Sequence, residues 1–61
     1  MSAYQYIYVD EVKHETENAV LVEIDGDPYW FPKSQLEDWP DVGYDGEMEA
    51  SEWILEQKGL L

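Results

Sequence analysis

The sequence predicts a small α+β domain with a twisted antiparallel sheet of three or four strands and one C-terminal helix. Three observations predict this class: alternating segments near the N-terminus, an Asp-Gly pair that suits a hairpin turn, and a capped apolar segment near the C-terminus. Whether the sheet stays open or curls toward a barrel is left open. With 61 residues, we expect one domain over residues 1–61.

The first predicted strand, residues 4–9, carries tyrosines at every second position, between glutamine, isoleucine and valine. This alternation places the tyrosines on one face, and aromatic and β-branched residues favour strands. Residues 10–18 are polar and acidic, so we predict a connection there. The second predicted strand covers residues 19–24. Its predicted core residues are Val20, Val22 and Ile24.

The Asp-Gly pair at residues 25–26 suits the positive φ angles of a two-residue hairpin turn. A third strand is predicted over residues 29–31, with Pro28 before it and Pro32 after it. Proline has no N–H to donate, so this strand either pairs over a short stretch or lies at a sheet edge. Residues 33–41 are predicted to form a loop with one helical turn.

A fourth strand is a weaker prediction over residues 42–48, because this segment contains two glycines. The tyrosines of residues 4–9 are expected in the core or at a subunit interface. Trp30, Pro32 and Trp53 are expected in the core, as large apolar residues usually are.

The C-terminal helix has recognisable start and stop signals. Ser51 is a suitable N-cap, and Glu52 places an acid in the first turn, where the helix dipole favours it. Trp53 and Ile54 supply the predicted apolar face. Gly59 suits the left-handed position that ends many helices.

Negative charge is the strongest compositional feature. Fifteen Asp and Glu residues stand against three lysines, which gives a net charge of -12. Residues 1–20 carry -3, residues 21–40 carry -4 and residues 41–61 carry -5, so the acidity is spread along the chain. Solubility of a small domain needs a net charge of only about 2 to 8, and a larger charge opposes compactness. We infer that something other than solubility maintains the excess.

Several functions are excluded by residue content. Without cysteine, and with His14 as the single histidine, neither disulfides nor a thiolate or histidine-rich metal site can form. The acids at residues 25–27 and 41–49 do not have the spacing of a calcium-binding EF-hand loop. We therefore expect no cofactor and no defined metal site. A serine–histidine pair, a phosphate-binding glycine loop and a cleft for paired carboxylates are not indicated, so we predict no enzyme activity.

No apolar run approaches the roughly 20 residues that span a bilayer. The N-terminus lacks the basic and apolar regions of a secretory signal. We therefore expect a soluble, cytoplasmic protein that makes no membrane contact.

The most distinctive motif is the Trp-x-Pro-Lys-Ser-Gln segment at residues 30–35. It follows a Glu-Thr pair at residues 15–16 and an apolar strand, and precedes the Trp-led helix, so that the pattern covers residues 14–61. In this pattern the chain resembles a small domain widely encoded by phages and prophages. The resemblance implies a phage accessory protein of the anti-defence (anti-CRISPR-like) class. The chain departs from the pattern in the acidity of residues 37–49 and at Gln57, where the pattern has a lysine.

Duplex DNA provides a scale for the charge. It carries one negative charge per about 1.7 Å of axis, so a net charge of -12 matches about 20 Å of duplex. We predict an inhibitor that mimics DNA and occupies a basic nucleic-acid-binding surface of a host defence or nucleic-acid enzyme. Trp39 and Tyr44 are predicted apolar anchors, and Trp39, which is flanked by acids, is a predicted hot spot for a partner bearing arginines. The predicted partner-binding residues are Glu37, Asp38, Trp39, Asp41, Tyr44, Asp45, Glu47 and Glu49.

Other interpretations stay open. The acids are also compatible with a plain solvated coat or with adaptation to high internal salt. A non-catalytic adaptor that docks on a phage or host protein through its aromatic face is the main alternative function. Direct stacking of nucleic-acid bases on the tyrosines needs a basic groove, which three lysines do not supply. A homodimer is also expected, because small domains often gain stability by self-association.

Overall fold

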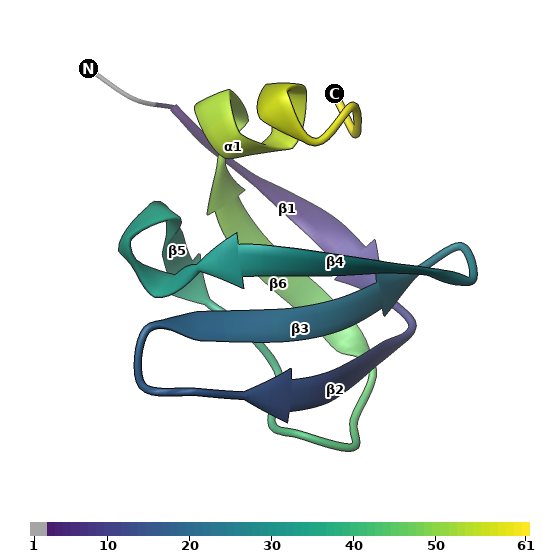
Figure 1. Ribbon diagram of the computed structural model, residues 1–61. Coiled ribbons are helices and arrows are strands. Elements are labelled where there is room, and N and C mark those ends of the chain that lie inside the picture. The colour runs from purple at the N-terminus through teal and green to yellow at the C-terminus, as the bar shows by residue number, and fades with distance from the viewer. Residues whose placement is uncertain (1–2) are drawn as a thin grey trace.

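The structure is a computed structural model that describes residues 3–61. Two three-stranded antiparallel sheets are followed by a single C-terminal helix in this range (Figure 1). The predicted α+β class is confirmed. The structure has six strands in this range, where three or four were predicted, because two short strands show no recognisable sequence pattern.

The first sheet has the strand order β1–β6–β5. It consists of β1 (Tyr4–Val9), β6 (Gly46–Ser51) and β5 (Leu36–Asp38). β1 is confirmed, and β6 begins later than the fourth strand predicted over residues 42–48. β5 lies where a loop was predicted, since three residues are too few to show a period.

The second sheet has the order β2–β3–β4, from β2 (Glu11–Glu15), β3 (Ala19–Ile24) and β4 (Asp27–Pro32). The chain passes from β1 to β2 through one bent residue, Asp10, whose N–H donates to the carbonyl of Glu23 at 2.8 Å. Figure 1 shows this sheet crossing in front of β1 and β6.

The prediction of a connection over residues 10–18 is wrong for β2. Within β2 only Val12 is apolar and buried, so no alternating pattern marks the strand. Its pairing with β3 contains a bulge, and the backbone of the later loop, at Gly43 and Tyr44, bonds the strand at Val12. These tertiary partners hold β2 in place, and a local sequence pattern does not report them.

The hairpin turn between β3 and β4 is confirmed. Asp25 and Gly26 have φ angles of 52° and 83°, as a type I′ turn requires. β4 lies at the edge of its sheet, as Pro28 and Pro32 predicted, and Pro32 is half-buried where a core position was expected.

Helical segments follow each sheet. The predicted helical turn is the 3-10 helix η1 (Lys33–Gln35), and the predicted C-terminal helix is α1 (Glu52–Gln57). Ser51 caps α1, because its Oγ accepts the N–H of Ile54 at 3.1 Å. Losing such a cap costs about 1 kcal/mol. Gly59 ends the helix with a φ of 76°.

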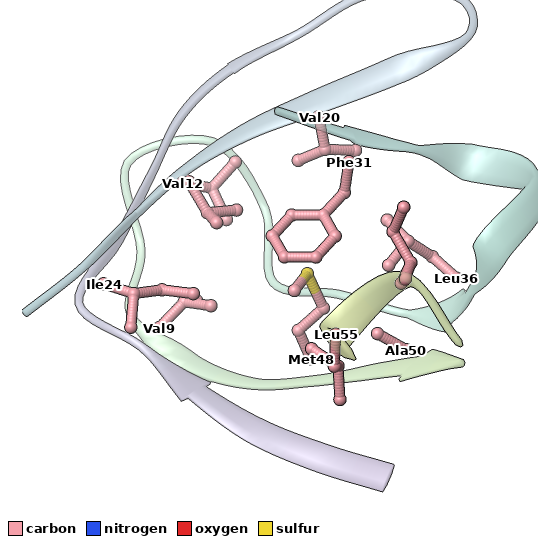
Figure 2. Packing of buried hydrophobic residues seen from close by; sticks show 11 residues of the cluster. Val9, Val12, Val20, Ile24, Phe31, Leu36, Met48, Ala50 and Leu55 are labelled. Atoms are coloured by element: carbon pink, nitrogen blue, oxygen red, sulfur yellow. The ribbon is translucent and has the colours of Figure 1, made fainter. Parts of the chain in front are cut away.

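The core lies between the two sheets and beneath α1. Phe31 and Met48 are fully buried near its centre (Figure 2). Because every strand and α1 contribute, the whole chain shares one core. Its buried apolar residues are Val9, Val12, Val20, Val22, Ile24, Phe31, Leu36, Met48, Ala50, Ile54 and Leu55.

Two core predictions are wrong. Trp30 and Trp53 are 45% and 54% exposed. In β4 the buried Phe31 points inward, so the alternation turns its neighbour Trp30 outward. In α1 the buried Ile54 and Leu55 form the inner side, which leaves Trp53 on the outer side.

Candidate partner-binding face

Two tyrosines stand on the outer face of the β1–β6–β5 sheet. Tyr6 and Tyr8 are 59% and 54% exposed, because the alternate residues of β1 point to the core side. Of the two predicted positions, the core is therefore wrong for both tyrosines, and the subunit interface stays a prediction. On β6, Glu49 lies opposite Tyr6 and Glu47 lies opposite Tyr8. Side chains of directly opposite residues share one face of a sheet, so each ring has a carboxylate beside it.

Three further acids complete this face. Asp38 of β5 pairs with Glu49. Asp45, just before β6, accepts a short hydrogen bond from the Tyr8 hydroxyl. Asp10 follows β1 and acts electrostatically on Tyr8. We name this surface the acidic tyrosine face; it consists of Tyr6, Tyr8, Asp10, Asp38, Asp45, Glu47 and Glu49.

The carboxylates change the acidity of both phenols. The charge of Glu49 raises the pKa of Tyr6 above its usual value, and partial desolvation adds to the effect. The hydrogen bond to Asp45 raises the pKa of Tyr8 in the same direction, because the bond favours the neutral phenol. At neutral pH the face thus presents two uncharged phenol rings among five carboxylates.

No carboxylate of this face forms an ion pair within residues 3–61. The ion pairs in this range lie elsewhere and join Lys13 to Glu11 and Glu23, and Lys33 to Glu15. The third lysine, Lys58, places its Nζ 5.8 Å from the ring centroid of Phe31. The acidic tyrosine face therefore carries negative charge that no lysine of the described chain offsets.

The structure brings half of the predicted partner-binding residues together in this face. They are Asp38, Asp45, Glu47 and Glu49. Glu37 is exposed at the irregularity of β5. Asp41 and Tyr44 are exposed in the loop before β6, where the N–H of Tyr44 donates to the carbonyl of Asp41 at 3.0 Å. These three residues lie outside the face as defined.

Trp39 is placed differently from the other predicted residues. It is half-buried against the core, and its Nε1 donates to Glu15 Oε1 at 3.2 Å. The Nζ of Lys33 lies 5.7 Å from the centroid of the indole ring. Contacts within the protein therefore cover much of the Trp39 side chain. The exposed aromatic rings beside the clustered acids are those of Tyr6 and Tyr8.

The sequence reasoning missed Tyr6, Tyr8 and Asp10 as site residues. A signal was present, because the tyrosines alternate with core residues in β1. In β6, Glu47 and Glu49 alternate with buried residues in the same way. Only the pairing of β1 with β6 shows that the two outer faces form one surface.

Across residues 3–61, no three His, Asp or Glu side chains are placed to hold a metal ion. The described part of the chain has no pocket. None of its helices is long and apolar enough to cross a membrane.

The chain matches no family model, no curated protein and no solved structure. The resemblance to the phage domain therefore stays a prediction from the motif at residues 30–35. The structure shows what this motif contributes to the fold. Lys33 pairs with Glu15 at 2.8 Å, and Gln35 accepts a 2.5 Å hydrogen bond from the buried helix cap Ser51. These two motif residues connect the segment after β4 to other parts of the fold.

Proposed function

We propose that the protein is a stoichiometric, non-catalytic inhibitor of phage origin that acts in the host cytoplasm. It would occupy a basic nucleic-acid-binding surface of a host defence or nucleic-acid enzyme by DNA mimicry. The observation that carries this proposal is the acidic tyrosine face, where five carboxylates surround two exposed rings and no described lysine pairs with them.

The local charge density supports this proposal. Residues two apart along a strand are about 6.8 Å apart, and neighbouring strands are about 4.8 Å apart, so the five carboxylates extend over about 14 Å along β6, from Asp45 to Glu49, and across three strands. Duplex DNA carries about eight charges over 14 Å of axis, against the five carboxylates of the face. Over the 31 Å long axis of the molecule, duplex would carry about 18 charges against a net charge of -12. Over equal lengths, the face and the whole molecule each carry roughly 60 to 70% of the charge of duplex DNA.

Rigidity favours the same function. Four of the five acids lie on strands or are hydrogen-bonded to one: Asp38, Asp45, Glu47 and Glu49. A paired backbone fixes their separation before a partner arrives, which lowers the entropy cost of binding. A field of one sign also speeds encounter with a basic groove.

The arrangement disfavours direct nucleic-acid binding. Bases that stacked on Tyr6 or Tyr8 would bring their phosphates beside the carboxylates. Proteins that stack bases surround the aromatic residues with basic groups, because phosphates supply much of the affinity. The proposed partner is therefore a protein with a basic surface.

The test compares two variants with the same net charge of -8, four acids fewer than the -12 of the natural chain. The face variant carries Asp38→Asn, Asp45→Asn, Glu47→Gln and Glu49→Gln. The control variant carries Glu17→Gln, Asp25→Asn, Asp27→Asn and Glu56→Gln, all exposed and outside the face. Tagged proteins are used to capture partners from a bacterial lysate, and duplex DNA is then added as competitor.

We expect the natural chain and the control variant to capture the same protein, and DNA and salt to release it. The face variant should lose this capture. Equal loss in both variants would mean that only total charge matters. Capture that is indifferent to ionic strength between about 50 and 500 mM would contradict mimicry.

The adaptor alternative is supported by the outer face of the second sheet. Trp30 is 45% exposed there, and the ring of His14 meets it edge-on with centroids 6.3 Å apart. An adaptor that docks through this face should keep its partner in the face variant and lose it in Trp30→Ser. The inhibitor predicts the reverse pattern.

A further inference from the structure

Tyr6 and Tyr8 form two repeated units along β1. Each ring has a glutamate opposite it on β6 and a second carboxylate near it, from Asp38 for Tyr6 and from Asp45 for Tyr8. Because the tyrosines are two residues apart in a strand, the units repeat at about 6.8 Å. Both rings are more than half exposed, so a partner can reach them.

The combination of ring and carboxylate suits one cation in particular. A guanidinium group is planar and weakly hydrated, so it can stack on an aromatic face. Its forked N–H groups can at the same time bind a carboxylate through two parallel hydrogen bonds. The ammonium group of lysine is compact and strongly hydrated, and it lacks this planar fork.

Resting on the proposed function, we propose that the acidic tyrosine face binds an extended arginine-bearing segment of the partner protein. The segment carries arginines at alternate positions, and one guanidinium stacks on Tyr6 while the next stacks on Tyr8. In an extended strand, side chains two residues apart share a face at about 6.8 Å, which matches the repeat of the two units.

Charge favours an arginine-bearing segment over a second copy of the chain or a nucleic acid as the ligand of this face. A second copy of the chain carries the same net charge of -12 and would be repelled by the face. Nucleic acid would be repelled in the same way. An arginine-bearing segment instead gains attraction from carboxylates that have no ion-pair partner within residues 3–61.

The experiment titrates the protein with two blocked peptides, Thr-Arg-Thr-Arg-Thr and Thr-Lys-Thr-Lys-Thr, and follows the backbone amides by NMR in about 50 mM salt. We expect the arginine peptide to bind about fivefold or more tightly than the lysine peptide, given the better stacking and forked pairing of guanidinium. The largest shift changes should fall on β1 and β6.

Variants test the role of the rings. Tyr6→Leu with Tyr8→Leu should weaken the arginine peptide about fivefold to thirtyfold, if each ring contributes about 0.5 to 1 kcal/mol. Tyr6→Phe with Tyr8→Phe keeps the rings and should keep the arginine preference. Tyr44→Leu, an exposed tyrosine outside the face, should change nothing. The NMR spectra also report whether each variant is folded.

Equal binding of the two peptides, or full binding by the double leucine variant, would overturn the arginine inference. If that happened while lysate capture kept its dependence on the face, on salt and on DNA, the inhibitor proposal would stand with another mode of contact. If the arginine preference held but DNA released no captured protein, the inhibitor proposal would fail and the arginine site would remain.

Discussion

At the scale of single residues, Glu15 shows how one acid can serve the fold in a chain dominated by unpaired acids. Its carboxylate accepts hydrogen bonds from Lys33 at 2.8 Å and from the Trp39 indole at 3.2 Å. The bond from Lys33, followed by that from Trp39, lowers the pKa of Glu15 below its usual value of 4.5. Glu15 thus connects β2 to the segments on both sides of β5.

This arrangement predicts a pH-dependent contribution to stability. A carboxyl whose pKa is lower in the folded than in the unfolded state stabilises the fold above its unfolded pKa, and this contribution is lost as pH falls through the folded pKa. Glu15→Gln should therefore lower the Tm at pH 7, and the difference should shrink toward about pH 3. Glu17→Gln, in the exposed loop after β2, is the control and should leave the Tm nearly unchanged. Thermal melts followed by circular dichroism at both pH values measure the effect, and a difference that persists at the lower pH would contradict it.

At the scale of elements, β4 protects the edge of its sheet. Ile24 and Asp27 close the two-residue hairpin as a hydrogen-bonded pair, so every second residue of β4 bonds to β3. Pro28 and Pro32 occupy the alternate positions, where an N–H would point to the free edge. Trp30 is then the one residue of β4 with an outward N–H. Another strand that approached this edge would therefore meet a single backbone donor.

Restoring the missing donors should expose this edge. Pro28→Thr with Pro32→Thr adds two outward N–H groups, and we expect dimers or larger species in about 500 mM salt, where charge repulsion is screened. Ser34→Thr, on the exposed side of η1, is the control and should have the same oligomeric state as the natural chain. Size-exclusion chromatography with light scattering reads the outcome. Identical profiles for the two variants would show that the prolines do not protect the edge.

At the scale of the whole molecule, the uneven placement of charge matters more than its total. The ion pairs among residues 3–61 lie away from the acidic tyrosine face, which gathers five of the fifteen acids. Like charges held this close oppose folding, so the face should lower the free energy of unfolding. A function of the face would explain why this loss of stability is tolerated.

The face variant described above should therefore be more stable than the natural chain. We expect a Tm higher by roughly 5 °C in low salt, with the difference shrinking as salt screens the repulsion. The control variant should gain less, because its acids are dispersed over two connections, the start of β4 and the helix. The same melts test adaptation to high salt, which requires the natural chain to unfold without molar salt. A face variant no more stable than its control would remove the argument for a functional cost.

Much of the candidate face could be predicted from the sequence. The alternation in residues 4–9 places the tyrosines together on one face, without showing whether that face is buried, and the acids of residues 37–49 stand out as a group. The sequence did not show that Trp39 would be half-buried or that these acids would surround Tyr6 and Tyr8. Both outcomes depend on contacts between distant segments, such as the bond between Tyr8 and Asp45, 37 residues apart.

Local chemistry alone determined β1, β3, the Asp-Gly hairpin and the capped helix α1, because alternation, positive φ angles and capping depend on near neighbours. It also determined the net charge of -12. Only the tertiary structure decided where that charge gathers. β2 and β5 are too short or too polar to be specified locally, and the pairing of β1 with β6 is fixed by burial of the shared core.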